Sequence, residues 1–198
     1  NVDQLILEPL ASSASVLSAE EQEAGVALVD IGGGTTDIAI FQDGIIRHTA
    51  VIPFGGNVLT EDIRQGCQIM KKQAEQVKQR FGSAISTEMK DNEIVCIPGL
   101  QGRNPREISL KNLAAIIEAR VTEIIEHVHF EIRNSGFEDQ LIGGVVLTLE
   151  NPWDSMIRID DCADLMPADR KFGYVNLGHV LGVSRFRVVL NGVGHKRG

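Results

Sequence analysis

The chain has 198 residues, 43% of them hydrophobic and 23% charged, which is typical of a globular protein that buries a sizeable core. Its formal net charge of −8 at pH 7 argues against nucleic acid as the main partner. The cysteines Cys67, Cys96 and Cys162 form no Cys-x-x-Cys pair, so the sequence predicts reduced thiols in a cytoplasmic protein and no zinc site.

The first quarter of the chain predicts a helix and three strands. Residues 8–20 are rich in small side chains, and Pro9 suits the first turn of a helix. Three apolar runs then read as strands, at residues 26–31, 37–41 and 45–51. Asp43-Gly44 lies between the last two runs and favours a tight hairpin. The pattern predicts an antiparallel three-stranded meander.

The rest of the chain predicts alternating helices and strands. Apolar residues at helical spacing predict two long helices, over residues 58–81 and 110–134. Short apolar runs predict two strands, at residues 93–97 and 143–148. After Thr148 the pattern is weaker and favours helices over 156–166 and 174–183 and a strand over 186–190.

One loop of the meander has the composition of a phosphate site: Asp30-Ile31-Gly32-Gly33-Gly34-Thr35-Thr36-Asp37. Glycines allow a tight turn and let backbone N–H groups approach an anion without a Cβ in the way. The hydroxyls of Thr35 and Thr36 can donate to phosphate oxygens. Asp30 can hold a water bound to Mg²⁺ or orient an attacking water, and Asp37 can support it or tie the turn. The sequence predicts a phosphate-binding loop.

A plain glycine-rich hairpin is the alternative interpretation of this loop. Three consecutive glycines would weaken such a hairpin without need, because glycine in a strand loses entropy and packs poorly. The loop is not a Walker loop, since no Gly-Lys-Ser/Thr follows, and it is not the Rossmann fingerprint, since no helix directly follows the turn.

The loop resembles the second phosphate loop of the actin, Hsp70 and sugar-kinase superfamily. Flanking segments narrow the resemblance to the FtsA family of bacterial cell division proteins over residues 5–148. These segments are Leu7–Ser12, Gly25–Asp30, Ile52–Asn57, Thr60–Ile63, Ala74–Lys78, Gly82–Ala84 and Pro105–Ser109. The resemblance implies an α/β, actin-like ATPase (ribonuclease H-like) fold, with this chain as one half. It assigns residues 1–83 and 135–198 to the subdomain called 2A, and 84–134 to a small inserted α/β subdomain, 2B.

Carried over residue by residue, the resemblance implies a site for ATP and Mg²⁺. Its members are the loop residues Gly32, Gly33, Gly34, Thr35, Thr36 and Asp37 at the phosphates, Gly55 and Gly56 beside the nucleotide, and Glu75 and Lys78 at the ribose. Asp30 would hold Mg²⁺ through a water or position the attacking water. From the residues alone, Glu75 and Lys78 read as an exposed helical ion pair.

Two features depart from the family pattern. The strand that ends at Thr148 normally runs into three glycines that make room for adenine, whereas Leu149-Glu150-Asn151-Pro152 follows here. Adenine recognition therefore stays open. The family's first half and its amphipathic membrane helix are not found in the sequence, nor is an apolar run of the ~20 residues of a membrane span or a signal peptide. We expect residues 1–198 alone to bind ATP weakly or not at all, and to be inactive.

A small basic group surrounds a Gly- and Pro-containing loop: Arg103, Arg106 and Lys111. A solvated loop is the simplest interpretation. The resemblance instead implies that subdomain 2B receives the acidic C-terminal peptide of the tubulin-like protein FtsZ, which would suit this charge.

His127 and His129 lie two residues apart on a predicted helix and so face different ways, which argues against a metal pair.

The resemblance implies a function in cell division. The protein would bind ATP, polymerise, and tether the FtsZ ring to the inner face of the cytoplasmic membrane through membrane elements absent from this chain. It would be a slow ATPase at most. The alternatives are a sugar- or acetate-type kinase of the same superfamily, an Hsp70-like chaperone, and a scaffold with a vestigial nucleotide loop.

Overall fold

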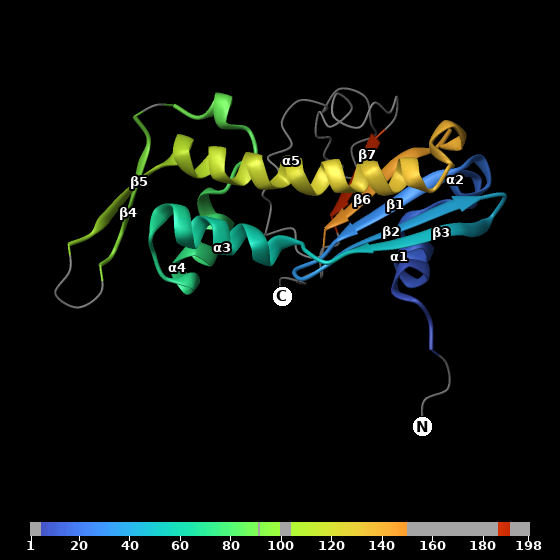
Figure 1. Ribbon diagram of the computed structural model, residues 1–198, viewed down its shortest axis with the longest axis horizontal. Coiled ribbons are helices and arrows are strands. Elements are labelled where there is room, and N and C mark those ends of the chain that lie inside the picture. The colour runs from blue at the N-terminus through green and yellow to red at the C-terminus, as the bar shows by residue number, and fades with distance from the viewer. Residues whose placement is uncertain (1–4, 91, 100–103, 150–185, 191–198) are drawn as a thin grey trace, which may run out of the picture. The chain divides into compact units, whose positions relative to one another are not determined.

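The computed structural model describes residues 5–90, 92–99, 104–149 and 186–190 (Figure 1). The expected helices over 156–166 and 174–183 lie outside the described residues, as do Arg103 and the segment 150–152. The described residues form two compact units, one up to Gly55 and again from Ile125, the other Gly56–Ile124. The subdomain boundaries that the resemblance implies, after residues 83 and 134, differ from these cuts and stay a prediction.

The first unit is built on a mixed sheet with strand order β3-β2-β1-β6-β7 in the part of the chain that the structure describes (Figure 1). The strands are β1 Val26–Ile31, β2 Thr36–Gln42, β3 Ile45–Ile52, β6 Gly144–Leu149 and β7 Phe186–Leu190. The first three are antiparallel neighbours, and β1, β6 and β7 run parallel. All five predicted strands of this unit are therefore confirmed. β1 is a central strand with its first four residues buried, which explains its unbroken apolar run.

The conformation of the turn between β2 and β3 explains why Asp43-Gly44 alone predicted a hairpin. Asp43 has φ 54° and Gly44 has φ 72°. Positive φ at both central positions matches the right-handed twist of the flanking strands, and Asp-Gly is a favoured pair there. Arg47 donates to the Asp43 carboxylate at 2.6 Å across the turn.

The helix expected in residues 8–20 is confirmed as α1 Glu8–Val16, with Pro9 in its first turn, but it ends at Val16 and a second helix, α2 Ala19–Ala24, follows. Leu17 takes an extended conformation and packs into a cluster with β1 and β2 residues. Ser18 then begins α2 with a capping box, in which its hydroxyl accepts from Glu21 N–H and the Glu21 carboxylate accepts from Ser18 N–H. Burial of Leu17 and this cap together divide the segment.

In the second unit, the single helix expected over residues 58–81 is wrong, because it is divided into α3 Gly56–Cys67 and α4 Lys71–Phe81. Gln68 has φ 52°, a left-handed conformation that ends a helix. Its N–H donates to Gln65 O, and the next N–H, of Ile69, reaches back to Arg64 O. These two bonds are those of a Schellman motif, which usually places glycine where this chain has Gln68.

The second unit also contains a two-stranded antiparallel ribbon, β4 Ile94–Ile97 and β5 Arg106–Ser109, and the short helix η1 Ser86–Glu88. Only β4 was predicted. The long helix α5 Leu110–Asn134 has the expected bounds and crosses from the second unit to the first, where η2 Glu138–Gln140 follows. In the described part of the chain no helix has the length and apolarity needed to cross a membrane.

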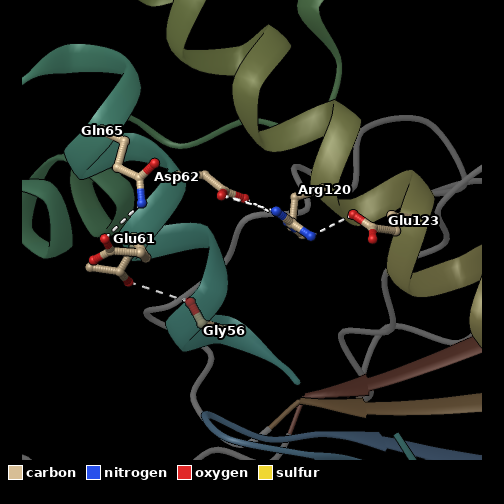
Figure 2. Close-up of polar contacts among 7 residues, drawn as sticks. Gly56, Glu61, Asp62, Gln65, Arg120 and Glu123 are labelled. Carbon is tan, nitrogen blue, oxygen red and sulfur yellow. Dashed lines mark hydrogen bonds and ion pairs between the residues drawn. The ribbon is translucent and has the colours of Figure 1, made fainter. Parts of the chain in front are cut away.

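A polar clamp joins α5 to α3 within the second unit. Arg120 of α5 donates through Nε and Nη2 to the two carboxylate oxygens of Asp62 in α3, at 2.5 and 3.0 Å, and through Nη1 to Glu123 (Figure 2). A two-pronged guanidinium–carboxylate contact fixes orientation as well as distance. The hydrogen bonds to Asp62 raise the pKa of Arg120 above its ordinary value. The clamp therefore fixes α3 against α5.

Candidate functional site

The predicted phosphate loop is a tight connection between β1 and β2. Asp30 lies opposite Asp37, and Ile31 lies opposite Thr36, in the antiparallel register. Gly32 N–H donates to Thr35 O at 2.9 Å and closes the turn. The three glycines therefore form the tip of a hairpin whose base is fixed by the sheet.

The loop lines a cavity of about 380 Å³ within the first unit. Its walls are Glu8, Ser12, Asp30, Gly32, Gly33, Gly34, Thr35 and Asp37. Ser12 of α1 donates its hydroxyl to Asp30 Oδ2 at 2.9 Å, and Thr35 donates to Asp37 Oδ2 at 3.0 Å. A Cβ built on Gly34 meets nothing within 4 Å, so the loop tip is open to a ligand.

Glu8 and Ser12 are wall residues that sequence reasoning missed. They lie one turn apart on α1, so they share a face of that helix. They lie near Asp30 because α1 packs beside β1. Ser12 and Asp30 are 18 residues apart in the sequence, so no local pattern marks their contact. The one available signal was the run Leu7–Ser12 within the FtsA resemblance, which marked the segment but gave it no role.

Thr36 was expected to meet phosphate, but the structure gives its hydroxyl another partner. The side chain is fully buried, and its Oγ1 donates to the carbonyl oxygen of Phe54 at 2.9 Å. Thr36 is not among the residues that line the cavity. Its observed bond ties the start of β2 to the chain that leaves β3.

Gly55 lies against the base of the same loop. A Cβ at this position would lie 2.3 Å from Gly32 O and 2.9 Å from Thr35 O, closer than atoms can approach. Both neighbours are backbone atoms of the turn. Glycine at 55 is therefore required by a close approach of two chain segments, and the loop and Gly55 form one assembly in the first unit. Gly56 begins α3 in the other unit.

Glu75 and Lys78 form part of a buried cluster in the second unit. The Lys78 side chain is only 4% exposed, and its Nζ donates to Gly56 O at 3.1 Å, Thr60 Oγ1 at 2.9 Å and Glu75 Oε2 at 2.9 Å. Thr60 in turn contacts Glu75 Oε2. The exposed helical ion pair, the alternative suggested by spacing alone, is wrong for Lys78.

Replacing Glu75 with glutamine is expected to remove part of the acid sensitivity of the fold. Burial raises the pKa of Glu75, but hydrogen bonds from Thr60 and Lys78 outweigh it, so the folded-state pKa lies below the ordinary 4.5. A lowered carboxyl pKa stabilises the protein above 4.5, and that stability is lost as pH falls through the folded-state value. Urea unfolding at pH 7 should show the variant about 1 kcal/mol less stable.

The difference between Glu75→Gln and wild type should shrink as the pH is lowered below 4.5. Glu107→Gln is the matched control, since Glu107 is an exposed carboxylate in the same unit. A constant difference across the acid range would show that the buried cluster is not the source.

Arg106, one of the three basic residues expected to bind a partner, forms hydrogen bonds within the second unit. Its guanidinium donates to the carbonyl oxygens of Cys67 and Gln68 at 3.1 and 3.2 Å, and to Gln68 Oε1 at 2.8 and 3.0 Å. It thereby covers the C-terminal end of α3, where a cation is favoured. Arg103 lies outside the described residues, and Lys111 is in the first turn of α5.

Arg106 also lines a cavity of about 530 Å³ in the second unit. Its walls come from the α3–α4 turn and from the ends of β4 and β5: Gln68, Ile69, Met70, Gln73, Ile97, Pro98, Gly99, Asn104 and Arg106. Gln73 donates to Pro98 O at 2.9 Å and joins the two sides.

Arg106→Ala is expected to destabilise the second unit by about 1–2 kcal/mol, because the last carbonyls of α3 lose a charged donor. Arg106→Lys should recover less than half, since an ammonium cannot donate in the same fork. Chemical denaturation measures both. Arg80→Ala, an exposed arginine of α4, should change stability by less than about 0.5 kcal/mol. Equal effects at 80 and 106 would contradict the capping role.

The two histidines of α5 face different ways, as their spacing predicts. The His127 ring packs edge-on against Phe54 with centroids 5.1 Å apart, whereas His129 Nε2 lies 3.4 Å from Glu138 Oε1. Within the described ranges, no group of three or more His, Cys, Asp or Glu side chains is arranged to hold a metal ion.

Comparison with known proteins places this chain in a family. The family model described as cell division protein FtsA matches residues 27–190. Cell division protein FtsA of Pseudomonas aeruginosa is 48% identical over 147 residues, 74% of this chain and 35% of that protein. The protein of the same name from Escherichia coli K12 is 45% identical over 154 residues, 74% of this chain and 37% of that protein. The chain thus spans little more than a third of the length of these relatives.

Among solved structures, MreB5 of Spiroplasma citri bound to ADP superimposes with a TM-score of 0.58 at 25% identity, over 77% of this chain and 48% of that one. The actin-like α/β fold predicted from the loop and its flanking segments is confirmed.

Proposed function

Because the chain belongs to the FtsA family of cell division proteins, we propose that it supplies one side of an ATP site in an actin-like protein that assembles at the bacterial division site. The observation that carries the proposal is the cavity bounded by the β1–β2 loop and α1. The MreB5 structure similar to this chain is of a protein bound to ADP.

The residues of this cavity fit a nucleotide's phosphates. Glycines at the tip allow backbone N–H groups to come close to an anion, and Gly34 has open space where a side chain would stand. Gly55 admits the loop into its close position. Thr35 adds a hydroxyl that contacts Asp37 at present and can turn to a phosphate oxygen. Together these groups form a concave surface that suits an anion.

Asp30 is the residue that would hold Mg²⁺ through a water. Ser12 fixes one of its carboxylate oxygens by donating at 2.9 Å, so the side chain has a defined direction at the cavity wall. When bound, Mg²⁺ would neutralise phosphate charge. The protein's own groups would orient the phosphates and any attacking water. Hydrolysis is slow at most in this proposal, and ATP acts mainly as an assembly ligand.

Gly56, Glu75 and Lys78 would contact the nucleotide in the intact protein, as the resemblance to the family implies. The 530 Å³ cavity beside Arg106 would receive the acidic C-terminal peptide of FtsZ, since it combines a cation with the apolar residues Ile69, Met70 and Ile97. Self-association into filaments would then link FtsZ to the inner face of the cytoplasmic membrane.

Assembly of the intact protein tests this proposal. Light scattering and electron microscopy should show filaments with ATP and Mg²⁺, and far fewer without nucleotide. Replacing both Gly33 and Gly34 with valine should abolish the response to ATP, because two branched side chains would occupy the phosphate surface. Nucleotide-independent assembly that survives this double replacement would indicate a scaffold with a vestigial loop.

A further inference from the structure

A hydrogen bond between Ser12 and Asp30 joins α1 to the predicted phosphate loop inside the first unit. Ser12 Oγ donates to Asp30 Oδ2 at 2.9 Å, and both residues line the 380 Å³ cavity. Both residues are also partly buried, so water competes less for the bond than it would at an exposed site. A hydroxyl that donates to a carboxylate in such a place holds the orientation of that carboxylate.

We propose that Ser12 is a positioning residue for Mg²⁺ at the nucleotide, because it holds the Asp30 carboxylate in the orientation that accepts from a water bound to the ion. The inference rests on the proposed function, since it requires a nucleotide and Mg²⁺ in this cavity. It deepens that function by naming a group that acts through Asp30 without contacting the ligand. All the residues that it uses belong to the first unit.

The carboxylates of this cavity repel one another. Among the described residues that line it, Glu8, Asp30 and Asp37 are acidic and none is basic. Asp30 and Asp37 are direct partners in the antiparallel register of β1 and β2, so their side chains lie on the same face of the sheet. Like charges placed directly opposite repel. Without a donor that holds it, the Asp30 carboxylate would therefore turn away from Asp37 and adopt several orientations.

The two oxygens of the Asp30 carboxylate differ in their partners. Oδ2 accepts from Ser12, whereas the described contacts give Oδ1 no protein donor. The corresponding bond of Asp37, from Thr35, is exposed and lies within the loop itself, so it holds that carboxylate less firmly. Asp30 is thus tied to a helix through one oxygen and can accept from a water through the other. Mg²⁺ usually keeps several waters in nucleotide sites, and such waters are the donors that this oxygen suits.

Removing the Ser12 hydroxyl should loosen the Asp30 carboxylate and leave the helix intact. Ser12 lies inside α1, and alanine has the highest helix propensity, so Ser12→Ala should fold. Ser12→Thr keeps the hydroxyl and should keep the orientation of Asp30. Ser15→Ala is the matched control, because Ser15 is an exposed residue of the same helix whose hydroxyl donates to the backbone oxygen of Ser12.

The test is equilibrium titration of the intact protein with ATP, once in excess Mg²⁺ and once in EDTA. The ratio of the two dissociation constants measures how much Mg²⁺ adds to binding. Wild type should show a ratio of at least about tenfold, and Ser12→Ala should lower that ratio at least about threefold, as expected for a weakened hydrogen bond to a charged group. Its affinity in EDTA should stay that of wild type. Ser12→Thr and Ser15→Ala should keep the wild-type ratio.

A double variant distinguishes an effect through Asp30 from a direct or general one. Asp30→Asn should itself weaken ATP binding in Mg²⁺, because a neutral amide is a poorer acceptor for a water bound to the ion. The Ser12 hydroxyl then has no carboxylate to hold. Ser12→Ala should therefore weaken ATP binding in Mg²⁺ at least about threefold in the wild-type background, and less than about 1.5-fold in the Asp30→Asn background.

Two results would overturn the inference: an unchanged ratio in Ser12→Ala, or an equal loss of affinity on adding Ser12→Ala to wild type and to Asp30→Asn. Equal binding of ATP by wild type in Mg²⁺ and in EDTA would overturn it as well, yet leave phosphate binding standing. Melting temperatures accompany each titration, and Ser12→Cys, whose thiol is a weak donor, takes the place of Ser12→Ala if the alanine variant unfolds. Absence of ATP binding by wild type would refute the proposed function itself, and the inference with it.

Discussion

Replacing Gly55 with alanine is expected to lower the free energy of unfolding by about 3 kcal/mol, near the upper end of overpacking effects. The new Cβ would lie 2.3 Å from Gly32 O and 2.9 Å from Thr35 O. Both oxygens belong to the backbone of a turn that is held by the β1–β2 pairing, so no flexible side chain can move aside. The loop must shift as a whole, and ATP binding should fall with stability. Thermal and urea unfolding measure the first effect, and nucleotide titration the second.

Gly34→Ala is the matched control for stability, because a Cβ on Gly34 meets nothing within 4 Å and its φ is not in the left-handed range. It should leave the unfolding free energy within about 0.5 kcal/mol of wild type. Its added methyl group lies at the open tip of the loop, so ATP affinity should still decrease. Equal stability of the Gly55 and Gly34 variants would contradict the close approach described here.

Lys78→Met is expected to destabilise the second unit by a similar amount, about 3 kcal/mol, as for removal of one partner of a buried ion pair. Methionine fills the space of the lysine stem but gives no donor to Gly56 O, Thr60 Oγ1 or Glu75 Oε2. The Glu75 carboxylate is left partly buried without its cation. Urea unfolding at pH 7 is the measurement.

Lys72→Met on the same helix is the control, since Lys72 is exposed. Its effect should stay below about 0.5 kcal/mol. If the two lysine variants unfold at the same denaturant concentration, Lys78 is a surface residue and the cluster account is wrong.

The parts of the fold that the sequence predicted well are those with local causes. The meander follows from apolar runs and from Asp43-Gly44, whose positive φ values need no distant partner. Helix α5 has the bounds that its apolar spacing indicated. The break between α3 and α4 was missed because Gln68 is no usual helix terminator. What ends α3 there is a backbone motif reinforced by Arg106, 38 residues away.

In the candidate site, too, the features with local causes were predicted and the contacts between distant residues were not. The glycine loop and its aspartates were readable because phosphate binding needs that residue pattern within eight positions. The Ser12–Asp30 bond and the bond of Thr36 to Phe54 O each join residues 18 apart, and neither leaves a mark on periodicity. Spacing on α4 likewise could not distinguish an exposed ion pair from a buried one, since both place Glu75 and Lys78 one turn apart.

Calorimetric titration of the intact protein with ATP and Mg²⁺ tests most directly whether the loop Asp30–Asp37 binds the phosphates of ATP. We expect saturable binding that is weakened at least about tenfold when Gly33 and Gly34 are both replaced by valine, with the sheet still folded. Undiminished ATP binding by that double variant, or no binding by the wild-type protein, would contradict this expectation.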